Sequence, residues 1–168
     1  MGNPVILTEY SADWPQRFEA EREHLAKVFP AARIEHVGST SVPGLGAKPI
    51  VDILLGASSL AEIEERIPML EAMGYEYVER FNAIIPERRF FAKPPPRPRA
   101  FHLHAVTLDC GFFRDHLAFR DALRRDPALA QAYWALKQDL ARKHADDLEL
   151  YTEMKSPFIR SILSALGH

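Results

Sequence analysis

The sequence predicts an α/β fold of the α+β or mixed type, in which a mixed β-sheet is flanked by helices and the last third of the chain is helical. Short β-branched and aromatic runs fill the middle of the chain, and helical periodicity runs from Phe112 onward. The 168 residues fit one domain, and 47% hydrophobic residues suffice for a sizeable core. We therefore expect residues 1–168 to form a single domain.

The first third of the chain alternates strand and helix signals. Val5–Tyr10 is the expected first strand, and Ser11 is expected to cap the helix that follows, because serine readily accepts a bond from the first free N–H groups. A short strand is expected at Arg33–Val37. The apolar, β-branched run Pro49–Leu55 is typical of a central strand, with Asp52 as its single charge.

The rest of the chain is expected to form a helix, three strands and further helices. Apolar residues at helical spacing predict a helix over Ser59–Met73, which Pro68 interrupts. Proline at a first helical position predicts helix starts at Pro127 and Pro157. The three strands are expected at Tyr75–Phe81, Arg88–Ala92 and Phe101–Leu108.

Composition narrows the class of protein. A formal net charge of -2 and a pI near 6.4 argue against a surface that coats nucleic acid. The single Cys110 excludes an internal disulfide framework and fits a reducing compartment. The sequence shows no secretion signal and no apolar run of membrane-spanning length. We therefore expect a cytoplasmic protein that binds neither nucleic acid nor membrane.

A Gly/Ser-rich turn between the strands at 33–37 and 49–55 is the first candidate site. Its backbone N–H groups and three hydroxyls suit a phosphate. It differs from a Walker loop, since Ala47 precedes Lys48 and Pro49 follows it. Lys48 is placed to reach an anion held by this turn. The alternative is a turn capped by its own hydroxyls. The candidate phosphate-binding residues here are Gly38, Ser39, Thr40, Ser41 and Lys48.

Asp52 and two histidines are the candidate reactive groups. A carboxylate in an apolar strand is costly unless it is paired, hydrogen-bonded or bound to a metal, so Asp52 is a structural acceptor or a functional residue. His102 and His104 are two apart on an expected strand, so both side chains leave one face, as two ligands of one ion or two contacts to one phosphate would. Chance placement on an exposed strand is the alternative.

Basic residues near the expected site supply further anion contacts. Arg89 belongs to a group of five positive charges around a proline-rich loop, which attracts a phosphate-bearing ligand or simply forms a solvated hairpin tip. Lys155 lies one helical turn after Tyr151, on the same face, and either closes the site or pairs with neighbouring carboxylates.

These residues together resemble the GrpB family. The resemblance rests on four separated segments in order and extends from about Val5 to Leu166. That family is placed by similarity in the nucleotidyltransferase superfamily of the DNA polymerase β type, and a GrpB-like domain is fused to dephospho-CoA kinase in some bacteria. The matching segments are 35–44 (EHVGSTSVPG), 48–52 (KPIVD), 102–104 (HLH) and 151–155 (YTEMK).

The resemblance implies a nucleotidyltransferase-like fold and a specific site. Enzymes of this superfamily hold a triphosphate on a Gly-Ser turn and bind two magnesium ions through an Asp-x-Asp or Asp-x-Glu pair, often with a third carboxylate on a later strand. Gly38-Ser39 and Asp52 match the first two features. Position 54 is Leu, so the second carboxylate is missing, and His102 and His104 stand on the later strand.

The resemblance implies that the chain binds a nucleotide or phosphometabolite, with metal-dependent nucleotidyltransferase activity. Asp52 then binds the metal, and His102 or His104 completes its shell or acts as acid or base. The metal is Mg²⁺ held with the nucleotide, or Zn, Mn, Fe or Ni bound by Asp52 and both histidines, with Glu35 or His36 adding a ligand. Two alternatives remain: an inactive module that binds a nucleotide or CoA precursor, and a metal-dependent hydrolase built on Asp52, His102 and His104.

Overall fold

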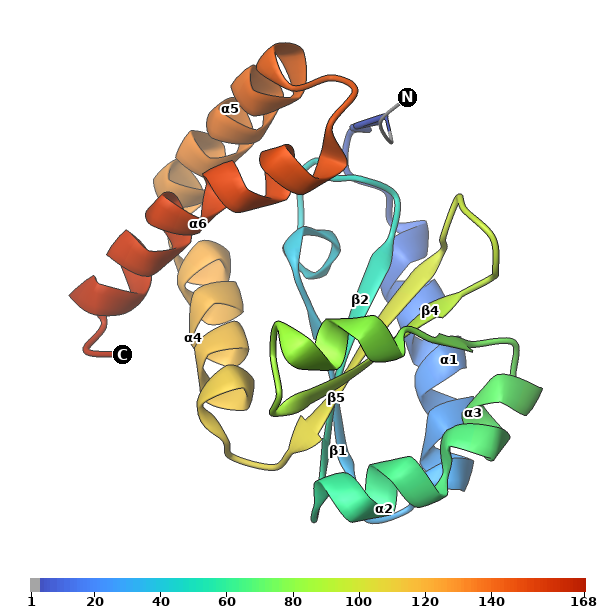
Figure 1. Ribbon diagram of the computed structural model, residues 1–168. Coiled ribbons are helices and arrows are strands. Elements are labelled where there is room, and N and C mark those ends of the chain that lie inside the picture. The colour runs from blue at the N-terminus through green and yellow to red at the C-terminus, as the bar shows by residue number, and fades with distance from the viewer. Residues whose placement is uncertain (1–3) are drawn as a thin grey trace.

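The computed structural model describes residues 4–168 and contains a five-stranded sheet with helices on both faces (Figure 1). The strand order is β1-β2-β5-β4-β3; β2 and β5 run parallel, and the other neighbours run antiparallel. The sheet is therefore mixed, as the sequence predicts. The strands are β1 (Arg33–Val37), β2 (Val51–Ala57), β3 (Glu76–Tyr77), β4 (Arg88–Lys93) and β5 (Phe101–Thr107).

The helices fall into two groups, one on each side of the sheet (Figure 1). The first group is α1 (Asp13–Val28), α2 (Leu60–Glu65) and α3 (Ile67–Ala72). The C-terminal group is α4 (Gly111–Arg125), α5 (Pro127–Lys143) and α6 (Leu148–Ala165). Two 3₁₀ turns, η1 (Ser39–Ser41) and η2 (Glu79–Ala83), follow β1 and β3.

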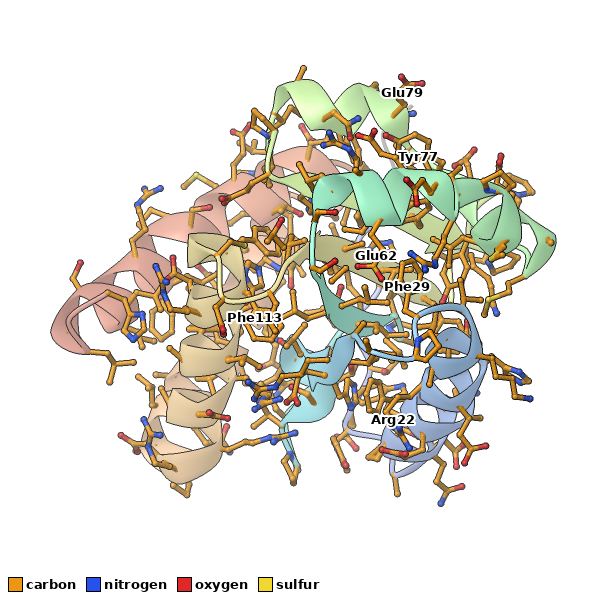
Figure 2. The ribbon with its side chains drawn as sticks, turned by 90° about the horizontal axis from the view of Figure 1, so that it is seen from below. Arg22, Phe29, Glu62, Tyr77, Glu79 and Phe113 are labelled. Atoms are coloured by element: carbon orange, nitrogen blue, oxygen red, sulfur yellow. The ribbon has the colours of Figure 1, made fainter. Side chains whose placement is uncertain are left out.

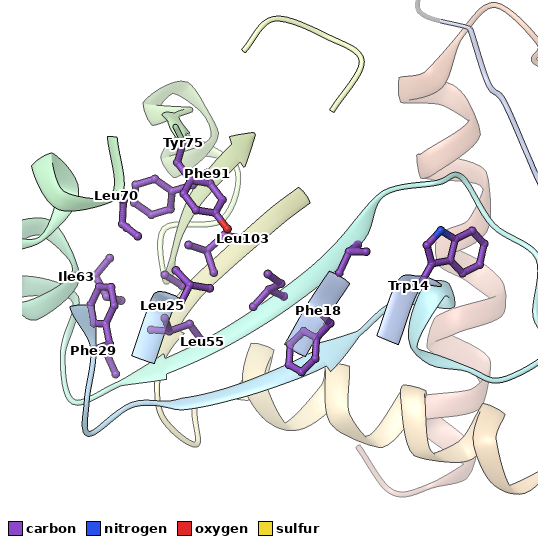
Figure 3. Packing of buried hydrophobic residues seen from close by; sticks show 14 of the residues in the cluster. Trp14, Phe18, Leu25, Phe29, Leu55, Ile63, Leu70, Tyr75, Phe91 and Leu103 are labelled. Atoms are coloured by element: carbon purple, nitrogen blue, oxygen red, sulfur yellow. The ribbon is translucent and has the colours of Figure 1, made fainter. Parts of the chain in front are cut away.

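The main core lies between the sheet and the first group of helices (Figure 3). Alternate residues of β2 and β5, including Leu55 and Leu103, point into it and meet Leu25 and Phe29 from the α1 segment. Complete burial of each such side chain contributes about 1.5–3 kcal/mol relative to leaving it exposed. This apolar layer fixes the sheet against α1–α3.

The opposite face of the sheet carries a smaller core and the polar candidates. Leu54 and Val106 pack there against Phe113 of α4. Figure 2 shows Phe29 and Phe113 pointing inward from the two helical layers, whereas Arg22 lies at the periphery. Because side chains alternate along a strand, Asp52 shares this second face with Leu54. The C-terminal helices therefore lie on the side of the candidate site.

Two helix starts were predicted from proline, and one is confirmed. Pro127 opens α5, where the Asp126 carboxylate accepts hydrogen bonds from the Ala128 and Leu129 N–H groups at 3.1 and 3.2 Å. The predicted start at Pro157 is wrong, because that residue lies inside α6. This helix already begins nine residues earlier, at Leu148, after Asp147, whose side chain accepts a bond from the Leu150 N–H group at 3.1 Å.

Three further predictions of secondary structure need correction. Val5–Tyr10 makes only an isolated bridge, in which Thr8 and Ala47 exchange backbone hydrogen bonds, so it is not a strand. The predicted strand at Tyr75–Phe81 shortens to β3, since the chain continues as η2. Ser59–Met73 contains two short helices; Pro68, which has no N–H to continue the first helix, sits at the start of the second.

No helix within residues 4–168 combines the length and the apolar character needed to span a bilayer.

Candidate functional site

Asp52 lies directly beside the turn that follows β1. Antiparallel pairing sets Val37 opposite Asp52, so the next residue, Gly38, comes close to the carboxylate. A Cβ atom at Gly38 would lie 2.5 Å from Asp52 Oδ2. Gly38 also has φ 73° and ψ -177°, a conformation essentially restricted to glycine. The Gly-Ser turn and the carboxylate are therefore packed as one unit.

Two of the three hydroxyls in the turn are bonded to the protein, one to β1 and one within the turn. Thr40 Oγ1 lies 2.9 Å from His36 Nε2 in a buried hydrogen bond, and Ser41 Oγ donates to the Gly38 carbonyl at 2.5 Å. The prediction that Thr40 and Ser41 offer their hydroxyls to a phosphate therefore needs correction. Ser39 instead lies near Tyr133 and opposes the rise in the Tyr133 pKa caused by burial and by Tyr151.

The two histidines share one face of β5, as predicted from their spacing, and both approach Asp52. The parallel register places Asp52 beside His102 and Leu54 beside His104. His104 Nε2 lies 3.1 Å from Asp52 Oδ1, and His102 Nδ1 lies 3.7 Å from the same oxygen. Only the contact to His104 is a hydrogen bond. The side chains of Asp52 and His102 are about one quarter exposed, at 28% and 25%.

The structure adds Arg88 to this cluster. The Arg88 Nη1 group donates to His104 Nδ1 at 3.2 Å, so His104 is bonded on both ring nitrogens. The guanidinium lies 4.8 Å from the ring centroid of Phe90 and 5.7 Å from that of Phe112. Burial lowers the Arg88 pKa to about 10, against an opposing effect of Asp52. Sequence reasoning counted Arg88 among the basic residues but did not place it in the site.

The contacts of Asp52 keep it ionised, and burial keeps His102 neutral near pH 7. Burial alone raises the Asp52 pKa, but the hydrogen bond from His104, the electrostatic effects of both histidines and the charge of Lys48 outweigh it. The pKa of Asp52 therefore lies well below its ordinary value of 3.8. Burial lowers the His102 pKa to about 4.

The predicted three-ligand metal site is not formed by residues 4–168. In this part of the chain no three His, Cys, Asp or Glu side chains are arranged to hold a metal ion. Glu35, a predicted extra ligand, instead accepts a bond from Arg120 at 2.7 Å and pairs with Arg33. His36 is turned away and stacks on Phe18, with 4.8 Å between ring centroids. Asp52 alone can hold a divalent ion only if oxygen atoms of a bound small molecule complete the coordination shell of that ion.

Three lysines approach one another beside Asp52. Lys48 and Lys155 both approach the Tyr151 ring, with Nζ 5.5 and 4.8 Å from the ring centroid. Lys137 is only 2% exposed, and its ammonium donates to the Gly46 carbonyl. Burial and neighbouring lysines lower the pKa to about 7 for Lys155 and about 6 for Lys137. Burial also lowers the pKa of Lys48.

Lys137 was missed by sequence reasoning, although a signal was present. Tyr133, Lys137 and Leu140 follow the i, i+4, i+7 spacing of one helix face, and all three are buried in α5. A lysine within such a stripe must be buried with the rest of the stripe. A buried lysine without a carboxylate partner is rare enough to mark a candidate site.

Tyr151 stands at the centre of this lysine cluster. The residue is fully buried, and its hydroxyl has no hydrogen-bond partner within residues 4–168. Buried hydroxyls are nearly always bonded, so an orphaned one on a ring that two lysines approach needs an explanation, such as a ligand or ion. Burial raises the Tyr151 pKa above that of a free phenol, so the hydroxyl keeps its proton and can donate it to an anion.

Arg89 lies on the opposite face of β4 from Arg88, so its predicted role at the site needs correction. It forms an ion pair with Glu64 at 2.9 Å. Strand alternation separates it from His104, whose neighbour on β4 is Phe90. The sequence could not reveal which of two adjacent arginines faced the histidines, since that depends on the pairing register.

Two pockets lie near the candidate site, but most of the residues that line them are not the candidate site residues. A pocket of about 70 Å³ is lined by His102, Phe90 and Arg97 among others. A pocket of about 740 Å³ lies between segment 42–46 and the start of α5, with Trp134 and Arg124 in its wall. None of Asp52, the two histidines or the three lysines lines the larger pocket. The candidate site is therefore separate from it.

Comparison with known proteins identifies the family. The model of the family described as GrpB protein matches residues 4–165. A UPF0157 protein of Pseudomonas aeruginosa is 40% identical over 156 residues, covering 89% of this chain and 62% of that protein. The glutamate-rich protein GrpB of Alkalihalophilus pseudofirmus is 32% identical, with coverage of 96% and 95%. A dephospho-CoA kinase of Mycolicibacterium paratuberculosis is 28% identical, with coverage of 94% and 44%.

Solved structures extend the comparison to the fold. The conserved protein GrpB from Enterococcus faecalis superimposes with a TM-score of 0.85 at 38% identity, covering 94% of each chain. Cid1 poly(U) polymerase with MgGTP bound gives 0.54 at 15% identity, with coverage of 80% and 44%. Terminal uridylyl transferase 4 from Trypanosoma brucei with bound dUTP gives 0.57 at 14%, with coverage of 94% and 54%. The chain therefore belongs to the GrpB family, and its fold resembles that of the nucleotidyltransferases.

Proposed function

We propose that the chain binds a nucleotide, or another phosphate-bearing metabolite, between the Gly38-Ser39 turn and helices α5 and α6, and that this site supports metal-dependent nucleotidyl transfer. The observation that carries the proposal is the lysine cluster around the orphaned Tyr151 hydroxyl. Two structures of similar fold hold MgGTP and dUTP, which supports a nucleotide as ligand.

The charge balance of the site favours a phosphate. Lys48, Lys137 and Lys155 influence one another electrostatically, and Asp52 is the carboxylate that acts on all three. A ligand with several negative charges would hold these amines in their protonated form and accept a bond from Tyr151. Hydrogen bonds to a charged group contribute about 1.5–3 kcal/mol each. The Ser39 hydroxyl adds a neutral donor on the sheet side, whereas the Ser41 and Val42 N–H groups donate to carbonyls of the turn itself.

Asp52 is the proposed metal ligand. Its Oδ1 accepts from His104, whereas Oδ2 faces Gly38, so Oδ2 is the oxygen beside the proposed phosphate position. A Mg²⁺ ion held there with the ligand would neutralise phosphate charge as bonds to phosphorus form and break. His102 is neutral near pH 7 and lies near Asp52, so it is the proposed acid or base at the reacting group.

A catalytically inactive module that binds a nucleotide or CoA precursor is the second candidate function. Leu54 favours it, because the missing second carboxylate is replaced by a fully buried side chain packed with Val37 and Phe113. The similarity to a dephospho-CoA kinase supports including CoA precursors among the ligands tested. The hydrolase alternative is disfavoured because His104 uses both ring nitrogens in hydrogen bonds.

Titration calorimetry with nucleoside triphosphates, dephospho-CoA and CoA, each with and without Mg²⁺, tests the binding proposal. Lys155→Met and Ser39→Ala should each lower the affinity for the ligand about tenfold or more. Each variant loses one hydrogen bond to the ligand, a charge-assisted one from Lys155 or one from the turn at Ser39. Lys143→Met is the matched control, since Lys143 is 64% exposed on α5. Equal affinities for wild type and the site variants would contradict the proposal.

A second measurement separates transfer from binding. Release of pyrophosphate from a bound nucleoside triphosphate, lost in Asp52→Asn, would support the transferase. Tight binding without pyrophosphate release over a panel of hydroxyl and phosphate acceptors would identify the binding module instead.

A further inference from the structure

The hydrogen bonds of His104 specify its tautomer. An arginine guanidinium has only N–H donors and no acceptor. The bond from Arg88 Nη1 therefore requires that His104 Nδ1 carry a lone pair. A neutral imidazole with an acceptor at Nδ1 has its proton at Nε2, and that nitrogen lies 3.1 Å from Asp52 Oδ1. The chain Arg88–His104–Asp52 thus runs in one direction, each group donating to the next.

Arg88 is held in place by contacts other than an ion pair. Its guanidinium lies near the rings of Phe90 and Phe112, and its buried Nε has no hydrogen-bond partner. Within residues 4–168 no carboxylate lies at ion-pairing distance from it. Arg88 is a half-buried arginine that bonds to an imidazole rather than a carboxylate. Such a pairing is unusual, because carboxylates are the preferred partners of the planar guanidinium.

We propose that Arg88 is a positioning residue that fixes His104 in the Nε2–H tautomer, so that His104 serves Asp52 as a hydrogen-bond donor and is withheld from metal binding. Asp52 Oδ1 is then committed to His104, and Oδ2, against Gly38, is the oxygen left for a ligand. In this arrangement a fixed donor orients the carboxylate where a second carboxylate is lacking at Leu54. The inference concerns the protein without ligand and holds whether or not a nucleotide binds.

Long-range ¹H–¹⁵N correlation spectra of protein labelled on histidine nitrogens test this directly. His104→Gln assigns the resonances. In wild type at about pH 7.5, His104 should show the pattern of a neutral ring protonated only at Nε2. An Nδ1–H tautomer, or a ring protonated on both nitrogens, would overturn the proposal.

Three variants show whether Arg88 is the cause. Arg88→Met should end the exclusive Nε2–H pattern, since Nδ1 becomes available to a proton, whereas Arg88→Lys keeps a donor and should restore it. Arg89→Met is the matched control on the opposite face of β4 and should leave His104 unchanged. An unchanged pattern in Arg88→Met that is still folded, as judged by its thermal transition, would show that Asp52 alone fixes the tautomer and overturn the proposal.

Adding Zn²⁺ alone to the wild-type protein tests whether His104 can act as a metal ligand. Because both nitrogens of His104 are bonded, Zn²⁺ at stoichiometric concentration should leave the His104 resonances in place. Displacement of the Nε2 proton by Zn²⁺ would make His104 a metal ligand and contradict the inference.

Discussion

Gly38 and Asp52 are in such close contact that no side chain can be added at residue 38 without displacing the carboxylate, since a Cβ there would lie 2.5 Å from Oδ2. This contact joins the Gly-Ser turn to the charged residue of β2. It explains in steric terms why a glycine precedes Ser39.

Gly38→Ala should reduce both stability and ligand binding. The backbone conformation at residue 38 costs about 1–3 kcal/mol for a residue with a side chain, and the clash with Asp52 adds to this cost. Urea denaturation measures the free energy of unfolding. Gly111→Ala is the control, because a Cβ at Gly111 would meet no atom within 4 Å. Similar losses in both variants would show that the contact with Asp52 is not the cause.

Anion affinity should increase as the pH falls from about 8 to 7. The pKa is about 7 for Lys155 and about 6 for Lys137, so each amine gains charge as pH decreases toward these values. Phosphate itself gains a proton mainly near pH 6, so its charge changes less over this interval. Calorimetry in buffers of different ionisation enthalpy should detect proton uptake on binding. Lys155→Met should reduce that uptake, and affinity that rises with pH would refute the prediction.

His36 should make folding less favourable in acid. Burial lowers its pKa from 6.5 to about 4 in the folded protein, so the unfolded chain binds a proton that the folded chain excludes. The free energy of unfolding should therefore fall between pH 6.5 and 4, by up to about 1.4 kcal/mol per pH unit for this group. His36→Gln should flatten the profile measured by chemical denaturation, and His24→Gln, at an exposed position, should not.

Leu54→Asp should destabilise the protein rather than create a second metal ligand. Leu54 is fully buried and packs in the cluster with Val37, Phe112 and Phe113. Leu54→Ala should cost about 2–5 kcal/mol through the cavity, and Leu54→Asp more, because an unpaired charge is also buried. Denaturation of both variants with and without Mg²⁺ tests this. A Mg²⁺-dependent gain of stability in Leu54→Asp alone would contradict it.

Local sequence patterns placed the turn, Lys48 and Asp52 near one another, because these residues are close in the chain. Alternation along one strand predicted that His102 and His104 share a face, whereas their approach to Asp52 depends on the parallel pairing of β2 with β5. Arg88 and Lys137 could not be placed in this way, since strand register selects Arg88 over Arg89 and helix packing buries Lys137. The short β3 and the helix that continues through Pro157 likewise depend on contacts with distant segments.

Tyr151 connects the last helix, α6, with the segment that precedes β2. Its ring is approached both by Lys48, which precedes β2, and by Lys155, its neighbour on α6. A polyanion seated among these side chains would clamp α6 to the sheet and act as a removable crosslink between segments about one hundred residues apart in sequence. Amide hydrogen exchange in α6 should then slow when such a ligand binds, while exchange in α2 and α3, on the far face, should change little.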